Sequence, residues 1–178
     1  SSDLATLSDD EVKTMALQVA KQEDTTNRVE PASGKYTSRL KKITSKVQAY
    51  DGLKLNFKVY KTPEINAFAL ADGSVRVYTG LMDIMKDDEL LCVIGHEIGH
   101  VKNGHSKEKM RVAYTASAAR QGVAASNSVA GSIAASELGG LAESVINAQF
   151  SQSEETQSDE YGLSMLQKLK KDPKAQEI

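Results

Sequence analysis

Cysteine is almost absent from this sequence: Cys92 stands alone, so the chain cannot form an internal disulfide and its redox compartment stays open. No run of apolar residues approaches the roughly 20 that a transmembrane helix needs. The charges nearly balance, because 22 basic and 24 acidic side chains leave a net charge of −2. This balance gives no electrostatic reason to expect nucleic acid or an anionic membrane as a partner.

The rest of the composition is typical of a globular protein. Of 178 residues, 40% are hydrophobic and 26% are charged, which is enough for one domain with a sizeable core. The chain begins with Ser1-Ser2 and has no initiator methionine. We therefore expect that any signal peptide or lipid anchor belongs to a preceding part that this sequence lacks.

Hydrophobic periodicity predicts an α+β fold, mostly helical, with a small three-stranded sheet whose edge strand borders the active-site cleft. We expect a single domain made of five segments in chain order. These are N-terminal helices in residues 1–52, the sheet in 53–80, a histidine-bearing helix in 87–112, an Ala/Ser/Gly-rich segment in 113–140 and a final helix in 141–171.

The strands follow from alternation of apolar and polar residues. Residues 53–60 alternate strictly and predict a half-buried strand. Residues 65–70 and 75–78 flank the turn Asp72-Gly73, which predicts a hairpin.

Helix signals occur at both ends of the chain. Ser8 and Glu11 have the spacing of a capping box, and apolar residues at helical spacing predict a second helix over residues 36–50. The small-residue segment reads either as closely packed helices or as a mobile insertion. We favour helices interrupted near its glycines, and a last helix that ends before a proline; the residues concerned are Gly122, Gly131, Gly139, Gly140 and Pro173.

All three histidines lie between positions 96 and 105, and two of them frame the string His96-Glu97-Ile98-Gly99-His100. Residues four apart on a helix share one face, with Cβ atoms about 5–6 Å apart, so two imidazoles can bind one metal ion. The glutamate between them flanks the same site and can take a proton from water there. The pattern indicates a zinc hydrolase with His96 and His100 as ligands and Glu97 as general base. Gly99 costs a helix about 1 kcal/mol relative to alanine, which a close neighbour would explain.

Catalytic zinc takes three protein ligands, so a third must be found. His105 is out of register for the longer motif H-E-x-x-H-x-x-G-x-x-H, because Asn103 and Ser106 stand where glycine and histidine are needed. We expect His105 to lie outside the ligand set, as a supporting or surface polar residue. Cys92 precedes His100 by eight residues, roughly 12 Å along a helix, and we expect it to be a packing residue.

An acidic pair on the last predicted helix offers a better third ligand. Glu155 and Asp159 are four apart, so both can face one point. We expect Glu155 to bind zinc and Asp159 to accept a hydrogen bond from a ligand histidine. Glu154 adjoins this pair, and the ligand could be misassigned by one; only Glu155 keeps the four-residue spacing to Asp159.

Together these features resemble the gluzincin class of zinc metallopeptidases. Within it they resemble the family of the CAAX prenyl endopeptidase and the bacterial heat-shock membrane protease. Its small soluble members, the bacterial lipoprotein peptidases associated with the outer membrane, are the most similar. The resemblance extends roughly from Leu53 to Leu166 and is carried by residues 66–69, 93–101, 104–105 and 150–159.

The chain departs from the family pattern in two respects. It has Ser151-Gln152 where relatives usually carry Ser-Arg, and Ser158 where they carry alanine. Relatives also continue into a helical segment with a His-Pro motif and a later arginine, which is absent after Ile178. If that segment contributes to catalysis, this chain is an incomplete enzyme. The oxyanion donor stays open between Tyr161 and the absent segment.

The resemblance implies a zinc-dependent endopeptidase with one Zn²⁺ per chain, acting on unfolded or misassembled proteins in the bacterial periplasm, at the outer membrane, as quality control. A missing N-terminal lipid anchor would provide the membrane association. It also implies that Asn66, Ala67, Phe68 and Ala69 form an edge strand to which a peptide substrate adds by backbone pairing.

Two other functions compete with this one. The first is a metal-stabilised, chaperone-like module that binds unfolded chains without cutting them, and the second is a helical scaffold without metal. Glu97 discriminates between the first alternative and the peptidase, because a purely structural site has no use for a general base.

Overall fold

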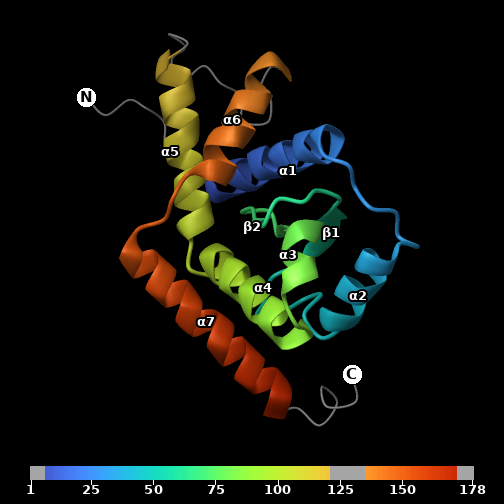
Figure 1. The fold of residues 1–178 in the computed structure, drawn as a ribbon. Helices are drawn as coiled ribbons and strands as arrows, with labels where there is room; N and C mark the ends of the chain where they lie inside the picture. The colour runs from blue at the N-terminus through green and yellow to red at the C-terminus, as the bar shows by residue number, and fades with distance from the viewer. Residues whose placement is uncertain (1–6, 121–134, 172–178) are drawn as a thin grey trace.

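The computed structural model describes residues 7–120 and 135–171, which form seven helices and three strands (Figure 1). This arrangement confirms the predicted α+β fold. The elements are α1 (Asp9–Thr26), α2 (Lys35–Ile43), β1 (Asn56–Tyr60), β2 (Ala67–Ala69), β3 (Ser74–Tyr78), α3 (Thr79–Ile84), α4 (Asp87–Lys102), α5 (His105–Arg120), α6 (Ala135–Asn147) and α7 (Gln152–Lys171).

The sheet has the strand order β1-β3-β2, with the fully buried β3 in the middle. Strands β2 and β3 are antiparallel, as the predicted hairpin requires, whereas β1 joins β3 in parallel. Phe57 lies opposite Val75, and Ala67 lies opposite Val77. Strand β2 is therefore an edge strand, and its outer side faces α4 and the site described below.

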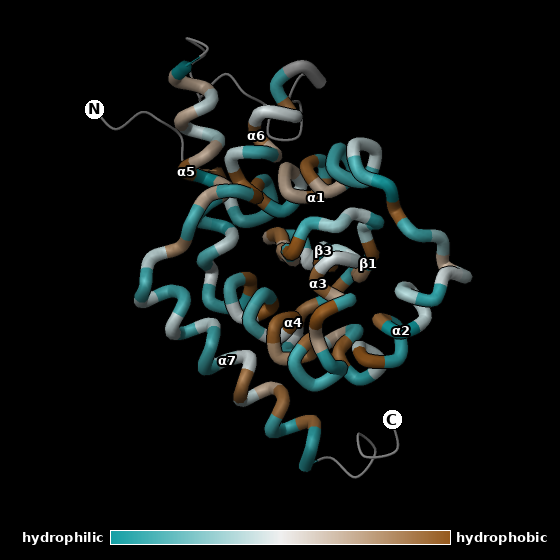
Figure 2. The backbone as a smooth tube through the Cα atoms, in the orientation of Figure 1, coloured by the Kyte–Doolittle hydropathy of each residue, from teal (hydrophilic) through white to brown (hydrophobic). Residues whose placement is uncertain are grey.

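Two apolar clusters meet at the sheet. One joins α1, α5 and α6 to β2 through residues such as Met15 and Leu141. The other joins α2, α4 and α7 to β1 and β3 through residues such as Ile94 and Met165. Figure 2 shows apolar residues concentrated on α4 and the strands. Within the described residues, no helix is both long and apolar enough to cross a membrane.

The N-terminal helix forms as predicted. The Ser8 side chain accepts a hydrogen bond from the Glu11 amide, and the Glu11 carboxylate accepts one from the Ser8 amide. Helix α2, in contrast, ends at Ile43 and not at residue 50. The Thr44 hydroxyl donates to the Leu40 carbonyl, and a turn follows that still buries Val47 completely. Helical spacing of apolar residues thus continues through a turn that is not helical.

The segment 87–112, expected to hold one histidine-bearing helix, contains α4 and the start of α5. The chain turns at Gly104, whose φ of +78° is a left-handed conformation that favours glycine. His105 therefore begins a new helix instead of continuing the old one.

The segment 141–171 likewise contains two helices, because residues 148–151 separate α6 from α7. Helix α6 runs through Gly139 and Gly140 without a break, so the interruption predicted there is wrong. The interruptions predicted at Gly122 and Gly131, and the helix end expected before Pro173, lie outside the described residues.

Helices α4 and α7 lie side by side (Figure 1), and their backbones approach closely at glycines. A Cβ added at Gly99 would lie 2.9 Å from the Tyr161 Cβ and 3.2 Å from the Ser158 Cα. A Cβ added at Gly162 would lie 2.8 Å from the backbone of both Cys92 and His96. Gly99 thus has the close neighbour that its place in a helix suggested. This contact brings the acidic start of α7 beside the histidines of α4.

Candidate metal centre

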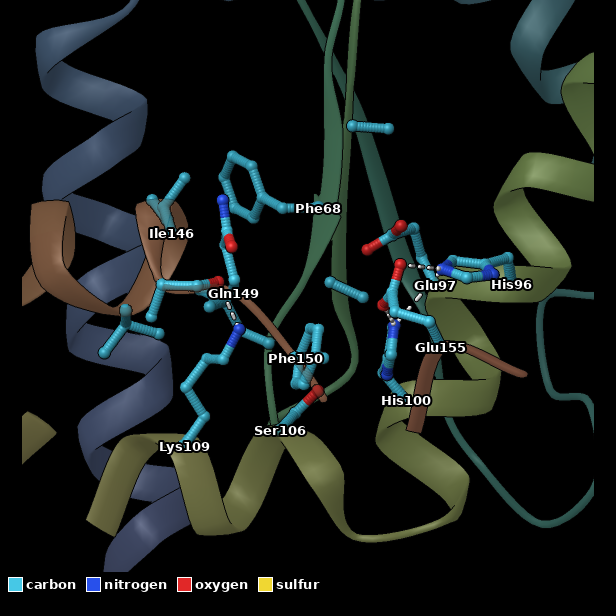
Figure 3. A pocket seen from close by; sticks show the side chains of 15 residues that line it. Phe68, His96, Glu97, His100, Ser106, Lys109, Ile146, Gln149, Phe150 and Glu155 are labelled. Carbon is cyan, nitrogen blue, oxygen red and sulfur yellow. Dashed lines mark hydrogen bonds and ion pairs between the residues drawn. The ribbon is translucent and has the colours of Figure 1, made fainter. Parts of the chain in front are cut away.

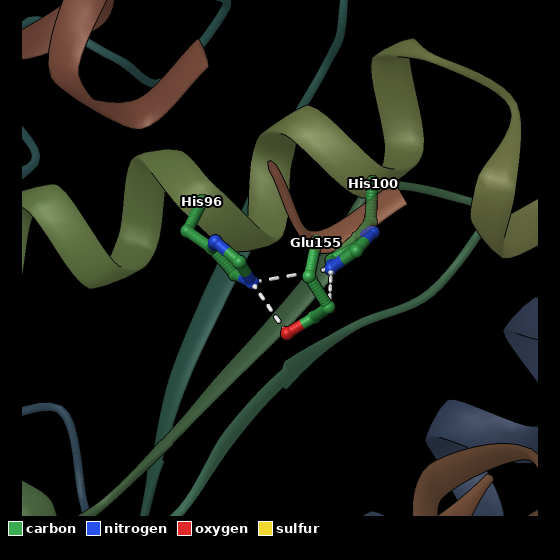
Figure 4. A group of neighbouring side chains, drawn as sticks. All are labelled: His96, His100 and Glu155. Atoms are coloured by element: carbon green, nitrogen blue, oxygen red, sulfur yellow. Dashed lines mark hydrogen bonds and ion pairs between the residues drawn. The ribbon is translucent and has the colours of Figure 1, made fainter. Parts of the chain in front are cut away.

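Three side chains from α4 and α7 converge on one point (Figure 4). The Nε2 atoms of His96 and His100 are 3.2 Å apart. Glu155 places Oε1 2.7 Å from the His100 Nε2 and Oε2 3.6 Å from the His96 Nε2. Within residues 7–120 and 135–171, no other group of three histidine, cysteine or acidic side chains converges in this way.

This donor set suits a zinc ion. Two imidazole nitrogens and one carboxylate oxygen are ligands that zinc accepts, and three protein ligands leave a fourth position for water or substrate. All three donor atoms lie within 4.8 Å of one another, so one ion can contact each of them. Cys92 and His105 are not members of this group.

The start of α7 separates the two neighbouring glutamates. The Ser151 hydroxyl accepts a hydrogen bond from the Glu154 amide, and the Glu154 carboxylate accepts one from the Ser151 amide. Glu154 is therefore occupied in a capping box. Glu155, one position later, is the one directed at the histidines.

Asp159 lies behind His96. Its Oδ1 is 2.7 Å from the His96 Nδ1 and can accept a hydrogen bond from it. A proton on Nδ1 leaves the Nε2 lone pair of a neutral imidazole free, and Nε2 is the atom directed at Glu155. The spacing of Glu155 and Asp159 thus places one carboxylate on each side of the same ring.

His100 has a different support. Its Nδ1 is 3.0 Å from the Nδ1 of the buried His105, whose Nε2 is 2.8 Å from the Oε1 of Gln157. Sequence reasoning did not identify Gln157, because its partner lies on α5 and no motif relates the two.

A cavity of about 440 Å³ opens beside the three donors (Figure 3). Glu97 faces this cavity from α4, and the edge strand β2 forms part of its wall. The lining residues are Ala67, Phe68, Ala69, Leu70, His96, Glu97, His100, Ser106, Lys109, Val145, Ile146, Ala148, Gln149, Phe150 and Glu155.

The environment of Glu97 favours its protonated form. Burial, together with the negative charge of Glu155, raises the pKa of Glu97 to about 8. The ammonium group of Lys109 and the backbone amide of Ala69 act in the opposite direction. A divalent cation beside this carboxyl group would also favour the ionised form.

The outer side of β2 presents backbone groups to the cavity. The Leu70 amide donates to the Ser74 carbonyl, and the Tyr78 amide donates to the Asn66 carbonyl. Pairing alternates in an antiparallel ladder, so the backbone groups of Ala67 and Ala69 point away from β3. The Asn66 side chain accepts from the Ala67 amide at 2.8 Å.

Two further residues line the cavity without a sequence signal for this role. Phe150 stacks on the His100 ring at a centroid distance of 3.6 Å and an interplanar angle of 13°. The Lys109 Nζ lies 3.1 Å from the centre of the Phe150 ring and donates to the Ala148 carbonyl. Burial lowers the pKa of Lys109 to about 8, although nearby glutamates act against this change.

Tyr161 does not reach the cavity. Its hydroxyl donates to the Asp51 Oδ2 at 2.8 Å, and its ring packs edge-on against Tyr50. This placement contradicts the suggestion that Tyr161 supplies the oxyanion donor.

Comparison with known proteins gives a family match. The model of peptidase family M48 matches residues 34–177. Metalloprotease YcaL of Escherichia coli (strain K12) is 43% identical to this chain over 165 residues, which cover 92% of this chain and 65% of YcaL. Metalloprotease LoiP of the same organism is 42% identical over 161 residues, which cover 90% of this chain and 64% of LoiP. Protease HtpX of Xanthomonas euvesicatoria is 54% identical over 50 residues, which cover 26% of this chain and 17% of HtpX. The chain thus spans just under two thirds of the length of YcaL and LoiP.

Proposed function

The chain belongs to peptidase family M48, and from this premise we propose that it is a zinc-dependent endopeptidase. The observation that supports this most directly is the convergence of His96, His100 and Glu155 beside Glu97, at the wall of a cavity bordered by an edge strand. A structural metal site would need neither the cavity nor the carboxyl group of Glu97.

In this proposal the two Nε2 atoms and the Glu155 carboxylate hold the zinc ion. When bound, zinc polarises the scissile carbonyl group and lowers the pKa of a water molecule to about 7. Asp159 holds the His96 ring by its Nδ1–H, which keeps Nε2 available as a ligand.

Glu97 acts as the general base. Its carboxylate takes a proton from the attacking water and returns it to the leaving amine. The cavity gives this carboxylate access to the water.

The substrate binds as an added strand beside β2. The backbone groups of Ala67 and Ala69 point away from β3 at the wall of the cavity, where an extended peptide can pair with them. On pairing, the Ala67 amide would exchange the Asn66 side chain for the peptide, and the Ala69 amide would exchange Glu97. Backbone pairing tolerates many side chains, which suits unfolded or misassembled proteins. A role in quality control in the bacterial periplasm, at the outer membrane, is a further part of the proposal, supported by the resemblance to the lipoprotein peptidases.

Casein cleavage in the presence of Zn²⁺ tests this function. We expect Glu97→Gln to lower kcat/KM by about 100-fold or more while zinc binding is kept, because the general base is lost and the ligands remain. Glu160→Gln makes the same change on the exposed side of α7 and should leave the rate unaltered.

Equal cleavage rates for the wild type and Glu97→Gln would remove Glu97 from the mechanism. The chaperone-like alternative makes a different prediction. It requires that the wild type, and a version extended to the length of its relatives, suppress aggregation of casein without cutting it. A zinc content far below one ion per chain, in protein purified without chelator, would instead favour the scaffold without metal.

A further inference from the structure

A row of three side chains leads away from the metal centre on the side opposite Glu155. His100 directs Nε2 at Glu155 and Nδ1 at His105, and His105 directs Nε2 at Gln157. Figure 4 shows the His100 ring with one nitrogen beside Glu155 and the other turned away. His100 and His105 are only 1% and 7% exposed, so water cannot easily replace the contact between their rings.

The hydrogen-bonding capacity of each group fixes the protons along this row. An amide oxygen can only accept, so Gln157 Oε1 requires a proton on the His105 Nε2. A neutral His105 then has a bare Nδ1, which accepts from the Nδ1–H of His100 at 3.0 Å. The Nε2 of His100 is thereby left with a free lone pair, as a metal ligand requires.

The opposite proton order is incompatible with metal binding. If Gln157 presented its NH₂ group, the His105 Nε2 would have to accept and its Nδ1 would carry the proton. His100 would then carry its proton on Nε2, the atom 2.7 Å from the Glu155 Oε1, where the metal would bind. The orientation of one amide group is thus coupled to the availability of a ligand atom.

We propose that Gln157 is a positioning residue of the metal centre, which acts through His105 to hold His100 in the tautomer that binds zinc. This inference rests on the proposed zinc site. Both ligand histidines are then oriented through Nδ1, His96 directly by the carboxylate of Asp159 and His100 through a second imidazole by a neutral amide. Phe150, stacked on His100, limits rotation of that ring.

Zinc affinity, measured by competition with a chromophoric chelator, is the first test. Gln157 is exposed, so Gln157→Leu should fold, and we expect it to weaken zinc binding about 10-fold because the acceptor is lost. Gln157→Glu keeps an acceptor at this position and should bind zinc at least as tightly as the wild type.

Exposed Gln167 on the same helix provides matched controls for both changes. Gln167→Leu and Gln167→Glu should retain wild-type affinity. Equal zinc affinity for Gln157→Leu and Gln167→Leu would overturn the positioning role while leaving the zinc site intact. Absence of zinc binding by the wild type would overturn the site and this inference together.

The tautomers themselves provide a readout that a purely structural role would not change. In zinc-loaded protein with ¹⁵N-labelled histidine, long-range ¹H–¹⁵N NMR should show His105 protonated at Nε2 and His100 at Nδ1. In Gln157→Leu the chemical shift of the His105 Nε2 proton should no longer be that of a hydrogen-bonded proton. In Gln157→Glu this chemical shift should stay that of a hydrogen-bonded proton. A proton on the His105 Nδ1 in the zinc-loaded wild type would refute the proposal.

Discussion

At the scale of single residues, two adjacent glutamates at the start of α7 have separate tasks. Glu154 satisfies the backbone of its own helix through Ser151, and Glu155 extends toward the histidines of α4. The four-residue spacing to Asp159 favoured Glu155 over its neighbour, and the capping box gives the physical reason why Glu154 points elsewhere.

Alanine substitutions should separate these tasks. We expect Glu155→Ala to weaken zinc binding by more than about 100-fold, because it removes a ligand and not merely a supporting group. Glu154→Ala should leave zinc affinity near the wild-type value and lower the free energy of unfolding by about 1 kcal/mol, since the helix loses half of its capping box.

Competition with a chelator measures the zinc affinity, and urea unfolding measures the free energy of unfolding. Glu160→Ala, on an exposed position of the same helix, is the matched control and should change neither. If Glu154→Ala abolishes zinc binding and Glu155→Ala does not, the ligand is assigned one position too late.

The residue scale also shows where sequence reasoning stops. His96, Glu97 and His100 follow from one short motif, because a helix alone determines how such neighbours face each other. Gln157, Lys109 and Phe150 lie in or beside the site through contacts with other elements. No local rule predicts such contacts, because they depend on how α5 and α7 pack against α4.

At the scale of elements, the contact between α4 and α7 decides whether the site exists. The helix itself spaces His96 and His100, and Glu155 reaches them because glycines let the two backbones approach closely. The breaks at Gly104 and at residues 148–151 begin α5 at His105 and α7 at Gln152. In this arrangement the His105 Nε2 lies 2.8 Å from the Gln157 Oε1.

Gly162→Ala tests the dependence of the site on this contact. The added methyl group would lie 2.8 Å from backbone atoms of Cys92 and His96, which cannot move without shifting a helix. We expect the free energy of unfolding to fall by about 1–3 kcal/mol and zinc affinity to fall with it.

Gly139→Ala is the matched control on α6, because nothing lies within 4 Å of its added methyl group. Helix propensity predicts that this variant gains up to about 1 kcal/mol. Thermal or urea unfolding compares the stability of the two variants, and zinc titration compares their zinc affinity. An equal gain of stability in Gly162→Ala and Gly139→Ala would contradict the tight contact between α4 and α7.

At the scale of the whole molecule, an ion pair between a buried arginine and a partly buried aspartate connects the N-terminal helix to the sheet. Arg76 of β3 is 2% exposed and donates from Nε and Nη2 to both carboxylate oxygens of Asp24 on α1, at 2.9 and 3.1 Å. Tyr60 and Lys58 of β1 donate to the same carboxylate. Burial acts to raise the pKa of Asp24, but the hydrogen bonds from Arg76 and Tyr60 outweigh it and hold the pKa below its usual value.

This ion pair predicts an acid-sensitive contribution to stability. Because the folded-state pKa of Asp24 lies below the unfolded value of about 3.9, its contribution is complete above that pH and is lost as the pH falls through the folded value. Asp24→Asn leaves Arg76 without its charged partner, and we expect a loss of about 3 kcal/mol at pH 7.

Urea unfolding of the wild type and Asp24→Asn between pH 7 and about pH 2.5 measures this contribution. The difference between the two proteins should be constant down to about pH 4 and then shrink. Glu97 titrates in both proteins, so its effect cancels when the free energy of unfolding of one is subtracted from that of the other. A difference that grows as the pH falls would contradict the lowered pKa of Asp24.

The sequence by itself determined the features that depend on near neighbours: the capping box of α1, the hairpin of β2 and β3, and the facing of His96, Glu97 and His100 on one helix. These follow from helical and strand geometry, which repeat over a few residues. Tertiary structure decided where helices end, which carboxylate of α7 meets the imidazoles, and which residues support them. Those outcomes depend on how closely helices distant in the chain can pack, and that distance is determined by the side chains of both partners at once.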